Sequence, residues 1–148
     1  MTQEELIASG RLVARGPVWE LREFEPGLLL IVPEEGAADS VESAQALVEA
    51  IAGYGRSQGR TAGVVGFVDR MGEQALPARR LYARLGRPEL VASAALLGAT
   101  GFGRAVASVF LGLYRPSVPI ALFEQPEEAL DWLRASVAEH ARPTGGGR

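Results

Sequence analysis

Residues 90–114, LVASAALLGATGFGRAVASVFLGLY, change from one apolar pattern to another within a short stretch. The first part, 90–98, is apolar or small without alternation, which is typical of a strand buried on both faces. The stretch therefore predicts a strand, a glycine-rich turn and a helix, which is the repeating unit of α/β folds. The helical spacing of the second part is carried by Phe102, Ala105, Val106, Val109, Phe110 and Leu113.

The same alternation of strand and helix occurs on both sides of this unit. Pro77 and Pro126 stand where the first turn of a helix accepts proline. Strands that alternate with helices predict a mainly parallel sheet covered by about four helices. Besides the unit above, we expect strands over 28–32, 61–69 and 119–124, and helices over about 40–54, 77–85 and 126–138.

The N-terminal part predicts an antiparallel edge to this sheet. Residues 1–10 suggest a short helical start, and residues 18–24 alternate roughly between apolar and polar side chains. The stretch EPGL at 25–28 suits a type II turn, because proline presets the second position and glycine supplies the positive φ of the third. Strands 18–24 and 28–32 should therefore pair as a hairpin at the edge of the sheet.

Small residues predict helix ends and close contacts. Asp39 or Ser40 should cap the helix that follows, and Gly53 and Gly55 should help to end it. Gly63 and Gly66 lie in a strand pattern, where glycine often marks the close approach of another segment. We expect a helix to pack closely over this strand.

The totals of the chain limit the classes of protein to which it can belong. Its 148 residues suit one domain, expected over 1–138, with a flexible tail over 139–148. The net charge of −3 leaves no basic surplus for phosphates, so no nucleic acid is expected as a partner. The chain has neither cysteine nor lysine, which excludes thiolate nucleophiles and lysine Schiff bases.

His140 is the only histidine, and it lies in the last expected helix next to the tail. A Ser-His-Asp triad or a histidine metal site would need it, and a solvated surface position fits neither. The N-terminal residues MTQEELIASG are acidic, and every apolar run is far shorter than the ~20 residues of a membrane span. We expect a cytoplasmic protein with no cofactor, no metal and no membrane span.

The glycines at 98, 101 and 103 raise nucleotide binding as one interpretation. A glycine-rich turn before a helix can hold phosphates, and Glu124 ends the next strand, where an acid could bind a ribose. The dinucleotide fingerprint, however, needs a glycine where this chain has Arg104, whose side chain would oppose close helix–strand packing. Nucleotide binding through residues 98–103 is therefore kept only as a lesser alternative.

Residues 104–133, RAVASVFLGLYRPSVPIALFEQPEEALDWL, combine a helix, a short strand and an acidic helix start. This stretch resembles the C-terminal half of the small SpoIIAA-like domains. These are similar to the STAS domains of anti-sigma-factor antagonists and, more distantly, to lipid-binding Sec14-type folds. With the expected hairpin and the stretch GVVGFVD at 63–69, the resemblance extends over about residues 11–135. It implies a bacterial SpoIIAA/STAS-like protein with a regulatory role in protein–protein contact.

One functional feature of that family is missing from the chain. STAS antagonists carry a phosphorylatable serine or threonine in the loop after the strand that matches 61–69. Here the loop reads DRMGEQALPARR (69–80), and no serine, threonine or tyrosine occurs before Tyr82. The resemblance therefore implies the fold and a role in protein contacts, without a phosphorylation switch.

Three hypotheses of different classes follow. The first is a non-enzymatic interaction module that forms a homodimer, because Leu111 and Tyr114 fall outside the apolar stripe of their helix. The second is a small apolar ligand, as in Sec14-type folds, held among the small residues of 91–103 beside Phe102 and Phe110. The third is an enzyme, for which the sequence offers few candidates.

Any site is expected at the carboxyl ends of the strands, where open α/β sheets bind their ligands. Asp69 and Glu124 end two of these strands and could form an acid–base pair if the fold brings them close. Helix caps and loop charges are the commoner use of such residues, so no catalytic residue is assigned. The expected ligand or partner site comprises Asp69, Arg70, Thr100, Phe102, Arg104 and Glu124.

Overall fold

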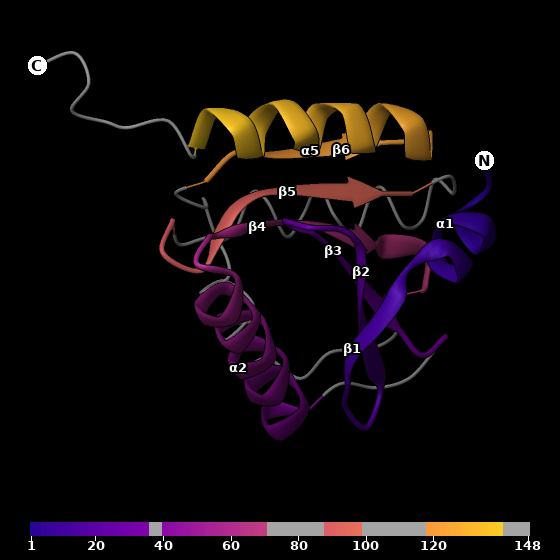
Figure 1. The fold of residues 1–148 in the computed structure, drawn as a ribbon. Coiled ribbons are helices and arrows are strands. Elements are labelled where there is room, and N and C mark those ends of the chain that lie inside the picture. Colours follow the sequence, from indigo (N-terminus) through magenta and orange to yellow (C-terminus); the bar gives the residue numbers. More distant parts are fainter. Residues whose placement is uncertain (36–39, 71–87, 99–117, 141–148) are drawn as a thin grey trace, which may run out of the picture.

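A computed structural model of the chain describes residues 1–35, 40–70, 88–98 and 118–140 (Figure 1). Within these ranges the chain forms three α-helices, a short 3-10 helix and six strands. The predicted helices over 77–85 and 102–114 lie outside them, so fewer helices are described than the four expected for the chain. In chain order the elements are α1 (Gln3–Ser9), β1 (Arg11–Arg15), β2 (Trp19–Glu25), β3 (Leu28–Pro33), α2 (Val41–Gln58), β4 (Ala62–Phe67), η1 (Val68–Arg70), β5 (Val91–Leu97), β6 (Ile120–Phe123) and α5 (Pro126–His140).

The six strands form one sheet in which they lie side by side in chain order, from β1 to β6. The pairs β1–β2 and β2–β3 are antiparallel. The pairs β3–β4, β4–β5 and β5–β6 are parallel. The expected α/β architecture, a parallel sheet with antiparallel N-terminal strands, is confirmed.

The hairpin of 18–24 and 28–32 is confirmed as β2 and β3, but the prediction that 18–24 is the edge strand is wrong. The preceding segment folds back as a further strand, β1, so β2 lies between two neighbours. β1 carries arginine at both ends, and its register shifts between Leu12 and Ala14. Charged ends and a bulge are features that keep a sheet edge from pairing with other chains.

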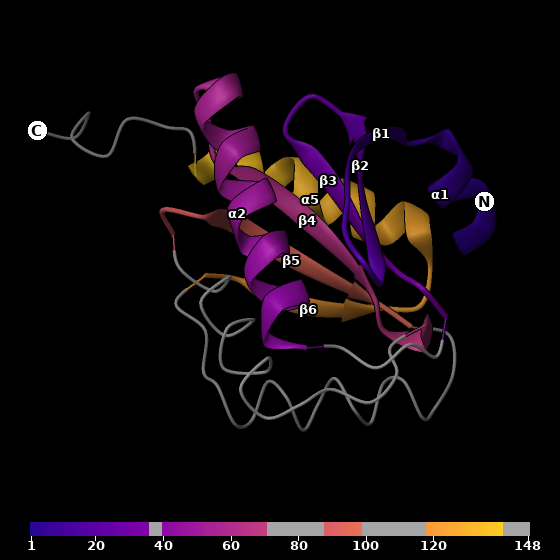
Figure 2. The ribbon, with the colours of Figure 1, turned by 90° about the horizontal axis from the view of Figure 1, so that it is seen from below.

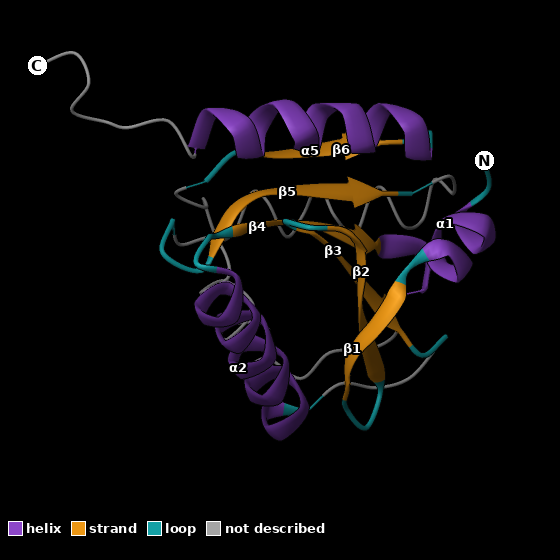
Figure 3. Ribbon diagram, viewed as in Figure 1, coloured by secondary structure: helices purple, strands orange, loops and turns teal. Residues whose placement is uncertain are grey.

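Helices cover both faces of the sheet, as Figures 1 and 3 show, with α5 on one face and α2 on the other. The view in Figure 2, turned by 90°, places α2 across the face opposite α5. Side chains of β3 alternate between the two faces: Leu28 and Leu30 join the core under α1 and α5, whereas Leu29 joins the core under α2. The expectation that this strand is buried on both faces is therefore confirmed.

The ends of α2 differ in part from the prediction. Ser40 is the N-cap, and its hydroxyl accepts a hydrogen bond from the backbone N–H of Ser43. The expected end near Gly53 and Gly55 is wrong, because α2 continues to Gln58 and is capped by Gly59 at φ 65°. The left-handed backbone of Gly59 ends the helix, whereas the two earlier glycines lie within it.

Close approach to the sheet is confirmed at Gly63 but not at Gly66. A Cβ on Gly63 would lie 2.7 Å from Cγ2 of Val137 and 3.2 Å from Cδ2 of Leu133, both on α5. A Cβ on Gly66 would meet Leu96 of the neighbouring strand at 3.2 Å, and no helix. The glycine at 63 thus lets α5 lie directly on β4.

The turn between β2 and β3 is tied to α2 through a buried tyrosine. The hydroxyl of Tyr54 accepts a hydrogen bond from the N–H of Gly27 at 2.9 Å and donates one to Glu23 at 2.6 Å. Arg11 of β1 bonds the other carboxylate oxygen of Glu23 at 3.0 Å. The hydrogen bond from Tyr54 lowers the pKa of Glu23. Burial is the main cause that raises the pKa of Tyr54, and the hydrogen bond to Glu23 raises it further.

The same turn is also fastened to the parallel half of the sheet and to α5. The carbonyl of Gly27, whose φ is 92° as a type II turn requires, accepts the N–H of Gly63 at 2.9 Å. The guanidinium of Arg134 binds both carboxylate oxygens of Glu25 and lies 5.8 Å from the centre of the Phe24 ring. Elements from both faces and both halves of the sheet therefore meet at residues 25–27.

We predict that Gly63→Ala destabilises the protein by about 1–3 kcal/mol, because overpacked sites cost that much. Val137→Ala removes the atom that the new methyl group would meet first. Chemical denaturation of both single variants and the double variant measures the coupling. The double variant should recover part of the loss caused by Gly63→Ala. If the two losses are additive, α5 does not approach β4 as described.

Candidate functional site

The carboxyl ends of β3, β4, β5 and β6 lie side by side near α1 in Figure 1. Together they form one edge of the sheet, made of strand ends rather than of an outer strand. Three of the predicted site residues are described and lie at this edge: Asp69 and Arg70 in η1 directly after β4, and Glu124 directly after β6. The other three, Thr100, Phe102 and Arg104, lie outside the described residues.

Two of these side chains bind neighbouring elements of the fold. A carboxylate oxygen of Asp69 accepts a hydrogen bond from Nε2 of Gln3, in α1, at 3.0 Å. Nε of Arg70 donates a hydrogen bond to the carbonyl of Pro33, at the end of β3, at 3.1 Å. Both bonds are partly buried and join segments far apart in the sequence. Asp69 and Arg70 thus hold α1 and β3 against the end of β4.

The proposed acid–base pair is not assembled directly by the sheet. β5 lies between the strands that Asp69 and Glu124 follow, so their backbones are two strand spacings apart, about 10 Å. At the end of β5 the N–H of Gly98 donates to the carbonyl of Phe123 at 2.9 Å. Among the described residues no group of three or more histidines, aspartates or glutamates could hold a metal ion.

The hypothesis of an apolar ligand concerns β5 and the residues after it. Ala92, Ser93 and Ala95 are buried in the packed sheet. Phe102 and Phe110, the other residues expected around such a ligand, lie outside the described residues, so the cavity stays a prediction. Within the described parts of the chain, no helix is long and apolar enough to cross a membrane.

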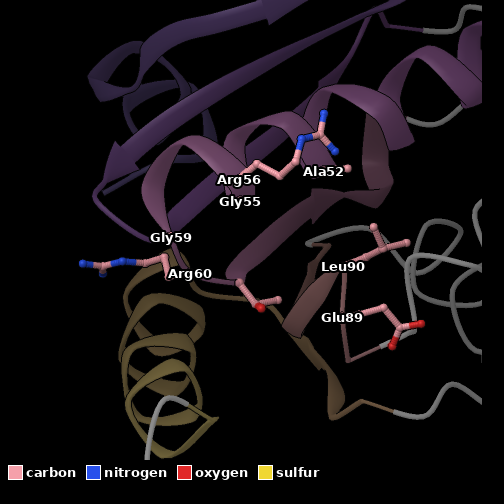
Figure 4. A pocket seen from close by; sticks show the side chains of 8 residues that line it. Ala52, Gly55, Arg56, Gly59, Arg60, Glu89 and Leu90 are labelled. Carbon is pink, nitrogen blue, oxygen red and sulfur yellow. The ribbon is translucent and has the colours of Figure 1, made fainter.

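A groove of about 410 Å³ lies at the opposite ends of the strands, beside the last turns of α2 and the starts of β4 and β5 (Figure 4). Two arginines, a hydroxyl group and one carboxylate supply its polar groups, and Ala52 and Leu90 supply apolar surface. The lining residues are Ala52, Gly55, Arg56, Gly59, Arg60, Thr61, Glu89 and Leu90.

This groove lies outside the ligand or partner site expected from the sequence. The signal that could have found it is GRSQGRT at 55–61, where a Gly-Arg pair occurs twice at a spacing of four. That spacing places small residues on one face of a helix and its cap. The sequence predicts only a helix end at Gly55 and a strand from residue 61 here, because the other wall of the groove comes from the segment before β5, which is distant in sequence.

We predict that the Gln3–Asp69 hydrogen bond contributes about 1–2 kcal/mol to stability, since hydrogen bonds to charged groups exceed neutral ones. Double-mutant cycles with Gln3→Ala and Asp69→Ala measure this coupling by denaturation. Gln45→Ala is the matched control, because its amide binds exposed Glu49 at 3.4 Å within α2. That control should change stability little. Additive losses at Gln3 and Asp69 would show that α1 is not held by this bond.

Comparison with known proteins identifies one family. A family model described as a domain of unknown function, DUF7793, matches residues 23–137. No curated protein and no solved structure gives a significant match to the chain. The matched range begins within β2 and ends within α5. It includes Asp69, Arg70, Glu124 and the residues that line the groove, but not α1. The chain belongs to this DUF7793 family.

Proposed function

We propose that the protein is a non-enzymatic interaction module with a SpoIIAA/STAS-like fold and without a phosphorylation switch. The proposal rests on Asp69 and Arg70. Both residues stand at the carboxyl ends of the strands, where α/β enzymes place their catalytic residues, yet both bind other elements of the fold. Asp69 binds Gln3, and Arg70 binds the carbonyl of Pro33. These bonds support a structural rather than a catalytic use of the two side chains.

The architecture supports the same proposal at the level of fold. A mixed sheet with antiparallel N-terminal strands and helices on both faces agrees with the resemblance derived from residues 104–133. Fold alone does not define function, so it does not identify the partner.

The partner we propose is a second copy of the chain. A dimer through the N-terminal edge is disfavoured, because β1 carries Arg11 and Arg15 and a register shift. The contact is instead proposed on the helix expected over 102–114, where the sequence leaves Leu111 and Tyr114 outside the apolar stripe. This helix lies outside the described residues.

Light scattering over micromolar concentrations tests the dimer, whose mass should be near twice 15.7 kDa. Tyr114→Glu should yield folded monomers, because it places a charge in the proposed contact. Leu12→Glu is the matched control on β1, where the side chain is 41 % exposed, and should leave the dimer intact. A monomer at every concentration would contradict the proposal, and dissociation by Leu12→Glu alone would move the contact to β1.

A further inference from the structure

The groove beside α2 owes its space to small residues on one side of the helix. Ala52 and Gly55 lie on this side of α2, and Gly59 caps its end in the left-handed conformation. A Cβ on Gly55 would lie 3.1 Å from the carbonyl of Arg60, so larger residues are disfavoured there. Apart from Arg56, the wall formed by α2 is therefore backbone and short side chains, which a ligand can approach closely.

The two arginines of the groove make no ion pair within the described residues, unlike most of the other described arginines. Arg56 makes no ion pair or hydrogen bond within the described residues, and Arg60 reaches only the carbonyl of Pro26 at 3.5 Å. Arg70 binds a carbonyl as well, at the other edge of the sheet. The remaining described arginines pair with carboxylates: Arg11 with Glu23, Arg15 and Arg22 with Glu20, and Arg134 with Glu25.

We propose that this groove binds a small molecule through an oxyanion, either a carboxylate or a phosphate. A guanidinium presents parallel N–H donors that suit both groups. Arg56 is the anchor, because it lines the groove and makes no ion pair or hydrogen bond within the described residues. Figure 4 shows that Arg60 points to the other side, so it contributes positive charge at the rim.

The opposite wall restricts the rest of the ligand. Glu89 and Leu90 come from the segment before β5, and Glu89 already takes part in an interaction of its own. A carboxylate on this side disfavours a second anionic group and suits a hydroxyl or amino group. The volume of about 410 Å³ is near the lower end for ligand sites, so the ligand is a small metabolite rather than a dinucleotide.

This proposal goes beyond the interaction module, since it would make the module responsive to a metabolite, and it stands independently of the dimer. Inorganic phosphate and acetate are the probes, titrated separately at constant ionic strength with chloride as the reference. Amide shifts of Gly55, Gly59 and Thr61 in ¹⁵N-labelled protein report on the groove. One or both probes should give saturable shifts that chloride does not reproduce. Tighter phosphate binding assigns a phosphorylated ligand, and tighter acetate binding assigns a carboxylate.

Variants decide whether the groove itself binds the probe. Arg56→Gln should weaken binding at least about tenfold, as loss of a charge-assisted hydrogen bond does. Arg15→Gln removes an exposed arginine from β1 and should leave the affinity unchanged. Ala52→Leu should abolish binding by filling the space beside α2. Two-dimensional spectra of each variant verify the fold. The proposal is overturned if neither probe gives saturable shifts, or if Arg56→Gln and Arg15→Gln bind alike.

Discussion

The hydroxyl of Tyr54 is the group on which the arrangement of this fold depends most. It accepts the N–H of Gly27 and donates to Glu23, so one side chain of α2 fixes the turn that joins β2 to β3. The carbonyl of the same glycine pairs with Gly63 at the start of the parallel strands. A buried N–H must be paired, and the hydroxyl of Tyr54 accepts the hydrogen bond from the N–H of Gly27. The antiparallel and parallel halves are thereby joined at a single turn.

This constraint also positions the groove. Tyr54 is followed at once by Gly55 and Arg56, so the hydrogen bonds that hold the tyrosine also hold the last turns of α2 beside β4. Gly63 then allows α5 to lie on the opposite face of the same strand. The edge that usually carries chemistry is used differently, because Asp69 and Arg70 bind α1 and β3 there. The described side chains of Asp69 and Arg70 thus bind neighbouring elements at one end of the strands, and an open groove lies at the other end.

Much of the fold could be predicted because it depends on local patterns. The uninterrupted apolar residues of β3 and the turn at 25–28 identify their elements without help from distant contacts. β1 was missed as a separate strand because its pairing with β2, rather than its own composition, defines it. The end of α2 was misplaced because Gly53 and Gly55 resemble a stop signal, while the left-handed backbone occurs at Gly59. Asp69 and Glu124 were correctly placed at one edge, but the Gln3 contact and the groove join segments distant in sequence, which periodicity does not report.

The free energy of unfolding of Tyr54→Phe tests the central role of the tyrosine most directly. The variant leaves a buried N–H at Gly27 without its partner, so a loss of about 2–3 kcal/mol is expected at pH 7. Glu23 has a pKa below its ordinary value of 4.5, so its contribution is present above that pH and is lost as pH falls through the folded pKa. The difference between wild type and variant should therefore shrink in acid. Ser57→Ala, which removes a hydroxyl whose partly buried hydrogen bond goes to the backbone carbonyl of Tyr54, should have a smaller effect. A Tyr54→Phe variant as stable as wild type at pH 7 would contradict the account.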